Sequence, residues 1–193
     1  MRADRRRTNG ERIVTAAQAV FRTDRLSVRR FVVGDEAALA ALLLDPATTE
    51  FLALPPISGT RHVQAIIAES IAAYAEETGP RAYAVELHAD GQLVGFCASH
   101  PDGGGAVEIM YALGRAMWGK GLGSELARGL THHCEEQFPG KAVSAYVAGE
   151  NAASMRILQK LAFRKLGWSR HQGFAGPVLR YERSPQGPIP DPG

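Results

Sequence analysis

Apolar and polar residues alternate over the middle of the chain, and their spacing changes at a cluster of glycines. Segment 107–113 has a two-residue period typical of a strand, with Glu108, Met110 and Ala112 opposite Val107, Ile109, Tyr111 and Leu113. After the glycines, apolar side chains recur four residues apart and predict a helix, at Leu122, Leu126, Leu130 and Cys134. The pattern therefore predicts a strand, a glycine-rich turn and a helix N-terminus in direct succession.

The remaining patterns place further elements on both sides of this unit. We expect strands at 24–31, 82–88, 93–100, 142–148, 165–170 and 178–183, and helices at 35–44, 60–77 and 151–162. The order β-α-α-β-β-β-α-β-α-β-β predicts a single α/β (α+β) domain, with a mixed, mostly antiparallel sheet flanked by helices.

Composition narrows the class of protein. The chain has 193 residues, of which 45% are hydrophobic and 22% charged, as in an ordinary soluble domain. A net charge of +2 gives no support for nucleic-acid binding by the whole domain. Cys97 and Cys134 lie inside apolar patterns and are interpreted as reduced core thiols, which favours a cytoplasmic location. No apolar run reaches membrane-spanning length, and a signal peptide is disfavoured.

The two ends differ from the middle. Residues 1–23 begin with an arginine-rich stretch and are predicted to form a flexible basic extension. Residues 185–193 are rich in proline and glycine and are predicted to be a disordered tail. The folded domain is therefore expected at 24–184.

Three interpretations compete for the glycine cluster. Residues 114–120 spell the G-x-x-x-x-G-K of a nucleotide P-loop, but Gly121 stands where a Mg²⁺-binding hydroxyl is needed. A dinucleotide fingerprint needs G-x-G-x-x-G after a first strand, whereas the spacing here is G-x-G-x-G in mid-chain. The third interpretation is a pyrophosphate loop of an acyl-CoA enzyme, in which first-turn N–H groups point at the anion.

The third pattern, Q/R-x-x-G-x-G/A, places Gly121 and Gly123 on its small positions and Trp118 on its first. This run resembles the GNAT acetyltransferases, and within them the RimJ/RimL-like branch that acetylates protein N-termini. Segment 23–29, TDRLSVR, is similar to the opening of that branch. Segment 151–163, NAASMRILQKLAF, resembles the GNAT helix that packs beside CoA.

The resemblance implies an N-acetyltransferase that uses acetyl-CoA by direct transfer, without a covalent enzyme intermediate. The backbone of Gly119–Ser124 would hold the pyrophosphate, Lys120 or Arg115 would add charge, and the edge of the central strand would hold the pantetheine. The implied cofactor-binding residues are Tyr111, Leu113, Trp118, Gly119, Lys120, Gly121, Leu122, Gly123, Ser124 and Asn151.

Two residues are candidates for proton transfer. Glu108 shares a strand face with apolar neighbours and is interpreted as the general base, with a structural carboxylate at a sheet edge or beside an arginine as the alternative. Many GNAT enzymes place a proton-donating tyrosine at the position of Leu158, which has no hydroxyl in this chain. We assign the role of proton donor to Ser154, one turn earlier on the same helix face. The alternative is that Ser154 is only a small residue that allows close helix packing. His100 is a further candidate base.

The acceptor cannot be read from the sequence with the same detail. The resemblance favours a protein or peptide α-amine and leaves open a small-molecule amine, such as a polyamine, an aminoglycoside or an amino acid. A non-catalytic acyl-CoA-binding domain is the alternative from another class. A homodimer also stays open. His132, His133 and Cys134 are adjacent on a predicted helix and point apart, so no metal site is predicted.

Overall fold

The computed structural model describes residues 18–54, 56–76 and 81–185. Its strands are β1 (Ala19–Arg22), β2 (Leu26–Arg30), β3 (Arg81–Leu87), β4 (Leu93–Pro101), β5 (Val107–Leu113), β6 (Val143–Ala148), β7 (Arg164–Ser169) and β8 (Val178–Arg183). Its helices are α1 (Glu36–Leu43), α2 (Pro46–Thr49), α3 (Thr60–Ala73), the short 3-10 helix η1 (Arg115–Met117), α4 (Leu122–Gln137) and α5 (Ala152–Lys160).

These strands form one sheet in the order β1-β2-β3-β4-β5-β6-β8-β7. All neighbouring pairs are antiparallel except β5 and β6, which are parallel. The predicted fold class, a mixed and mostly antiparallel sheet flanked by helices, is therefore confirmed.

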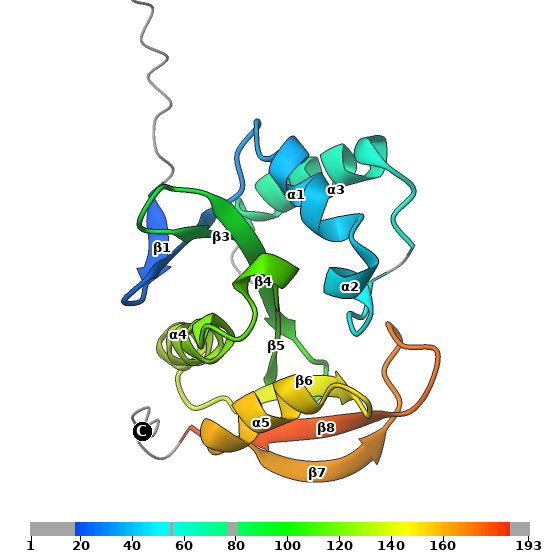
Figure 1. Cartoon of the computed structure of the whole chain (residues 1–193). Helices are drawn as coiled ribbons and strands as arrows, with labels where there is room; N and C mark the ends of the chain where they lie inside the picture. Colours follow the sequence, from blue (N-terminus) through cyan, green and yellow to red (C-terminus); the bar gives the residue numbers. More distant parts are fainter. Residues whose placement is uncertain (1–17, 55, 77–80, 186–193) are drawn as a thin grey trace, which may run out of the picture.

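Helices cover both faces of the sheet (Figure 1). Helices α1, α2 and α3 lie on one face, where a core forms around Phe31, Leu39 and Val63. Helix α4 lies on the opposite face, and its four-residue apolar repeat is fully or nearly fully buried, as predicted. Leu158, in the C-terminal half of α5, and Leu161, directly after the helix, join this second core. The chain therefore buries an apolar layer on each side of the sheet, which fixes the central strands.

The parallel pair β5–β6 opens like a V. Its register joins Val107 to Val143 and Glu108 to Ser144, and the pairing goes no further. Strand β5 stays paired with β4 along its whole length, as far as Leu113. The backbone of β5 on the β6 side is therefore left available beyond Glu108.

Two local predictions need correction. Residues 19–22 were assigned to the extension but form β1, because Val20 and Phe21 pack against the core beside α4. The rest of that extension, residues 1–17, lies outside the described residues, as do 186–193 of the predicted tail. Helix α2 was not predicted: Pro46 lies beyond the end of α1, and it is also the first residue of α2, a position that suits proline because no N–H is needed there.

Candidate active site

A pocket of about 250 Å³ opens on the face of the sheet that carries α1–α3, beside the V between β5 and β6. Its floor comes from β4, β5 and β6, and its walls come from residues 51–53 and from the turn between β7 and β8, residues 170–177. These walls touch each other, because a methyl group added to Gly173 would collide with Ala53. The pocket is therefore covered by two connections that lie far apart in the sequence.

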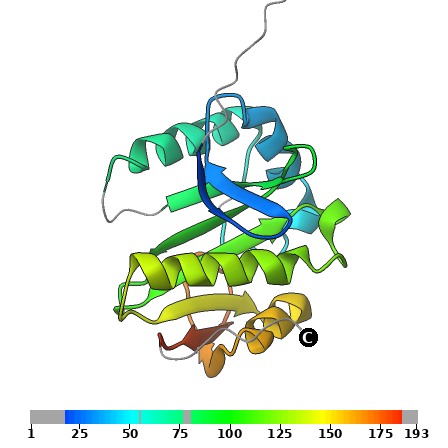
Figure 2. The ribbon, with the colours of Figure 1, turned by 90° about the vertical axis from the view of Figure 1, so that its left-hand side faces the viewer.

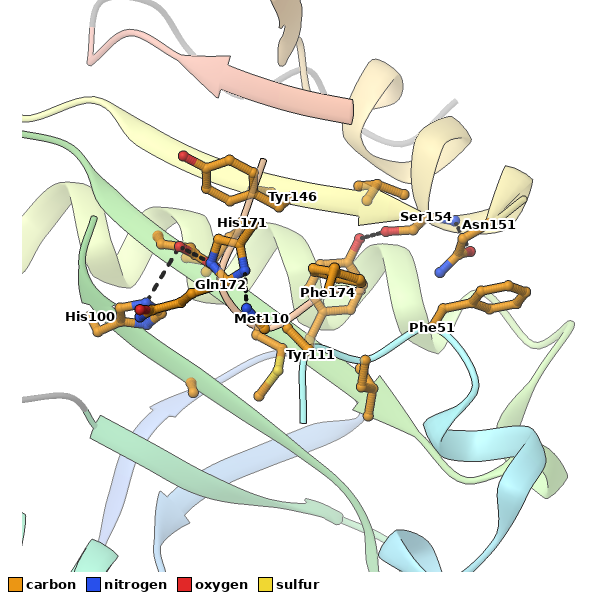
Figure 3. Close-up of a pocket in the computed structure, with 18 residues that line it drawn as sticks. Phe51, His100, Met110, Tyr111, Tyr146, Asn151, Ser154, His171, Gln172 and Phe174 are labelled. Carbon is orange, nitrogen blue, oxygen red and sulfur yellow. Dashed lines mark hydrogen bonds and ion pairs between the residues drawn. The ribbon is translucent and has the colours of Figure 1, made fainter. Parts of the chain in front are cut away.

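Glu108 lies at one end of this pocket and is 6% exposed. Its Oε2 is 3.2 Å from Nε2 of His171 and 3.4 Å from Nε2 of His100. Figure 3 shows the two imidazoles flanking this end of the pocket. The carboxylate is thus on a central strand, away from both sheet edges, and its ion-pair partners among the described residues are two histidines.

The tautomer of His171 follows from its second contact. The backbone N–H of Gly173 donates to Nδ1 of His171 over 3.2 Å, so Nδ1 must be unprotonated. A neutral imidazole then carries its proton on Nε2, which faces Glu108. His171 therefore donates to the carboxylate and fixes its orientation.

His100 is the more exposed of the two partners, with 36% of its side chain accessible. Its hydrogen bond to Glu108 raises its pKa above the ordinary histidine value, partial burial opposes this change, and the charges of Glu108 and Asp102 add to the increase. A proton on His100 is therefore stabilised by the same carboxylate that His171 orients.

A hydroxyl pair lies at the other end of the pocket (Figure 3). The phenol of Tyr111, from β5, is 3.1 Å from Oγ of Ser154, from α5. Burial raises the pKa of Tyr111 to about 12, although the bond to Ser154 opposes it. The phenol therefore keeps its proton at neutral pH and can donate a hydrogen bond.

The start of α5 explains why Ser154 points into the pocket. Asn151 caps the helix, since its Oδ1 accepts the backbone N–H of Ser154 over 3.0 Å. Leu158, one turn further, is fully buried in the core on the α4 side. A tyrosine at that position would have to displace core side chains, and the phenol that lies near Ser154 comes from β5.

The predicted phosphate loop lies at the N-terminus of α4, outside the pocket. Gly119 and Gly121 have φ angles of 72° and 77°, a left-handed region that favours glycine. Leu122, Gly123 and Ser124 form the first helical turn, where backbone N–H groups have no intrahelical acceptor. In the described part of the chain, no loop hydrogen bond uses the N–H groups of 119–124 either. The loop thus has the geometry of an anion site.

The edge of β5 connects the loop with the pocket. The N–H of Val107 donates to Ala142 on the β6 side, whereas that of Gly114 donates to Val94 on the β4 side. Because directions alternate along a strand, the N–H groups of Tyr111 and Leu113 face the open side of the V. This backbone can meet an extended ligand that runs from the loop to the pocket.

Trp118 joins the loop to the end of β5. Its indole Nε1 donates to the carbonyl of Leu113 over 2.8 Å, and half of its side chain is exposed. The indole therefore holds the loop against the end of β5 and occupies the carbonyl of Leu113, while the Leu113 N–H stays on the open side. Arg115 and Lys120 are both exposed beside the loop.

The structure brings some predicted site residues together and separates others. Glu108, Tyr111, Asn151 and Ser154 line one pocket. Residues Leu113 and Trp118–Ser124 form a second cluster around the start of α4. Sequence reasoning missed His171 and the Tyr111 phenol. A turn histidine between two strands carries no local pattern, whereas Tyr111 was read only for its backbone.

The open V lies between a glycine-rich helix start and a covered pocket, an arrangement that suits a transferase with a long, phosphate-bearing donor. A family model described as "Acetyltransferase (GNAT) domain" matches residues 25–164. The chain therefore belongs to the GNAT acetyltransferase family, a fold that uses acetyl-CoA as its acetyl donor. This confirms the resemblance to the GNAT acetyltransferases and the predicted acetyltransferase activity.

Similar proteins agree with this family. The chain is 27% identical over 150 residues to the uncharacterized N-acetyltransferase p20 of Bacillus licheniformis, covering 77% of this chain and 84% of that protein. A GNAT acetyltransferase structure from Bacillus anthracis superposes with a TM-score of 0.73 at 19% identity, covering 85% of this chain and 97% of that one. The structure of RimL, a ribosomal L7/L12 α-N-protein acetyltransferase in complex with coenzyme A, superposes with a TM-score of 0.73 at 16% identity. The superposition covers 86% of this chain and 98% of that one.

Among the described residues, no group of three or more histidine, cysteine, aspartate or glutamate side chains is arranged to hold a metal ion. No helix in the ranges that the structure describes has the length and apolar character needed to cross a membrane.

Proposed function

We propose that this chain transfers the acetyl group of acetyl-CoA to the α-amine of a peptide or protein N-terminus. The observation that carries the proposal is the neutral pocket with a single oriented carboxylate. Among the described residues that line it, Glu108 is the one acidic side chain, and most others are apolar or aromatic. A polyamine would favour several carboxylates, whereas an N-terminus needs one base and a wall that tolerates neutral backbone.

The acceptor's own basicity supports an α-amine. Removing a proton from an α-amine with a pKa near 8 costs about 1.4 kcal/mol at pH 7. The same step for a lysine side chain, with a pKa near 10.4, costs roughly 4–5 kcal/mol. A single carboxylate with two imidazole neighbours is sufficient for the first task, and a lysine would need a stronger base.

The residues of the coenzyme site fit the donor. Glycine positions with positive φ and unpartnered first-turn N–H groups suit a pyrophosphate, and the exposed edge of β5 suits the amide groups of pantetheine. When bound, acetyl-CoA supplies an activated acetyl thioester at the V. We assign the pyrophosphate contact to the backbone of Gly119–Ser124, with Lys120 nearby, and the pantetheine contact to Tyr111 and Leu113. Asn151 and Trp118 hold the elements that flank this path.

The two ends of the pocket handle different protons, one taken from the acceptor amine and one given to the departing thiolate. Glu108 takes the proton that the acceptor amine must lose, and His171 keeps the carboxylate in position. The Ser154–Tyr111 pair holds a hydroxyl proton for the departing thiolate at the opposite end. A cysteine-like thiolate has a pKa of about 8.5, so its protonation contributes at the low end of acid–base assistance, about 10²-fold.

A matched acceptor panel tests this function. We would offer acetyl-CoA with a lysine-free peptide that has a free α-amine, with the same peptide α-blocked and carrying one lysine, with a free amino acid, and with spermidine. Release of free thiol and mass spectrometry would report acetylation. We expect the free α-amine peptide to be the best acceptor. Preference for spermidine or for the lysine peptide would contradict the proposal, and CoA binding without any acetylation would favour a non-catalytic domain.

The two cysteines bear on location. Cys97 and Cys134 are free and buried. Such thiols are typical of proteins in a reducing compartment, so a cytoplasmic location is part of this proposal.

A further inference from the structure

The turn between β1 and β2 lies against the start of α4. Figure 2 shows this hairpin beside the helix. A methyl group on Gly129 of α4 would collide with Phe21 and Thr23 of the hairpin, so the two elements touch closely. The turn contains Thr23, Asp24 and Arg25, the start of the second sequence motif, for which the proposed chemistry has no use.

The contacts of this turn converge on one carboxylate. Glu125, in the first turn of α4, accepts from Thr23 Oγ1 over 2.6 Å and from the Arg25 backbone N–H over 2.7 Å. The Arg25 side chain donates to it from Nε over 2.7 Å and lies 2.6 Å away at Nη2. Its Nη1 donates to the carbonyl of Lys120 over 2.9 Å. Arg25 thus joins the hairpin to the phosphate loop and to the first turn of α4.

Glu125 stands where a carboxylate works against anion binding. Negative charge in a first helical turn interacts favourably with the positive end of the helix. A second anion bound by the N–H groups of this turn is repelled by this charge, because one helical turn, about 5.4 Å, is shorter than the Debye length of about 8 Å in physiological salt. Burial raises the pKa of Glu125, but bonds from Thr23 and Arg25 outweigh this and lower it, so the group is ionised. Its charge needs a partner if the loop is to hold a pyrophosphate.

The bond to Lys120 has a second consequence. In a planar trans peptide, the carbonyl oxygen and the following N–H point in opposite directions. Because Arg25 holds the Lys120 oxygen, the N–H of Gly121 points away from Arg25. This N–H belongs to the group assigned to the pyrophosphate.

We propose that Arg25 is a positioning residue of the coenzyme site, which neutralises Glu125 and sets the peptide unit between Lys120 and Gly121. The inference rests on the proposed function, because it takes the loop to be the pyrophosphate site. It gives a role in coenzyme binding to the Thr23–Arg25 turn, which has no part in the proposed chemistry of the pocket.

Calorimetry with two ligands separates this role from folding. CoA carries the phosphates and the adenosine, and pantetheine has the same thiol arm without either. For Arg25→Gln we expect CoA affinity to fall roughly fivefold, the upper end for a partly exposed charge pair, with pantetheine affinity unchanged. For Glu125→Gln, which removes the repelling charge and keeps an amide for Thr23 and Arg25, we expect CoA to bind about twofold to threefold more tightly. The double variant should return close to the wild-type value.

Arg22→Gln is the matched control, because Arg22 is exposed on the same hairpin and its loss removes the same charge. Its CoA affinity should stay at the wild-type value. If Glu125→Gln weakens CoA as Arg25→Gln does, the pair only braces the fold, and the charge-compensation role is wrong. If Arg25→Gln leaves CoA affinity unchanged while the wild type prefers CoA to pantetheine, the inference fails and the pyrophosphate assignment stands. If the wild type does not prefer CoA to pantetheine, both fail.

Discussion

His171 donates its Nε2 proton to Glu108, and the backbone N–H of Gly173 on its other nitrogen fixes that tautomer. A covering turn of the pocket thus orients the proposed base. His171→Ala removes this bond and should lower kcat/KM by about tenfold or more, the usual effect of losing a hydrogen bond to a charged group. His171→Gln places an amide N–H near the position of Nε2 and should recover most of the loss. Equal losses in both variants would show that the ring only packs.

The ion pair of His100 with Glu108 should make stability depend on pH. The folded-state pKa of His100 is raised by its bond to Glu108, so the pair contributes stability that is complete below about pH 6.5. This contribution is lost as the pH rises through the raised value. The gap in unfolding free energy between wild type and His100→Gln should therefore shrink from pH 5.5 to 8.5 in urea titrations. The same substitution in a Glu108→Gln background should show no such change. A gap independent of pH would mean that the pair carries no charge.

The Tyr111–Ser154 pair should act as a unit. Tyr111→Phe and Ser154→Ala should each lower kcat with little change in the KM for acetyl-CoA, together by about 10²-fold at most. Because the two hydroxyls share one hydrogen bond, the double variant should lose less than the product of the single losses. Single-turnover rates would report the chemical step. Strictly multiplicative losses would show that the hydroxyls act independently, and full activity in Ser154→Ala would limit the serine to packing.

Ala162 and Gly121 both have left-handed backbone angles, and exchanging alanine and glycine at the two positions should change stability in opposite directions. Ala162 ends α5 with a φ of 60°, where the bond from the N–H of Phe163 to the carbonyl of Leu158 closes a glycine-type cap. Ala162→Gly should stabilise the protein by about 1 kcal/mol, or roughly 2–4 °C in Tm. Gly121→Ala should destabilise it by a similar amount, since φ is 77° there and the added methyl meets only Nη2 of Arg25 at 3.5 Å, an ordinary contact. Calorimetric Tm values with equal signs would contradict this strain argument.

Much of the fold could be predicted from local sequence patterns. The strand, glycine turn and helix at 107–137 were predicted because each period is set by side chains that are neighbours in sequence. Strand β1 was missed because it has only four residues, too few to show a period. These residues become a strand only through pairing with β2. The start of α2 at Pro46 was missed because proline permits either a helix end or a helix start.

The candidate site divides in the same way. Glu108 and Ser154 could be proposed from motifs, and the structure places both in one pocket. His171 could not, since its meeting with Glu108 depends on the path of the β7–β8 turn across the sheet. The salt bridge between Arg25 and Glu125 joins residues 100 positions apart in the sequence, which no local pattern can reveal.

The pH dependence of Glu108→Gln on a free α-amine peptide tests the central claim most directly. The ratio of wild-type to variant kcat/KM should be about 10²-fold or more near pH 7, because a base must remove the amine proton. It should then fall as the pH rises past the acceptor pKa of about 8, where the amine is already neutral. A ratio that stays constant from neutral to alkaline pH would contradict the account and leave Glu108 with a structural role.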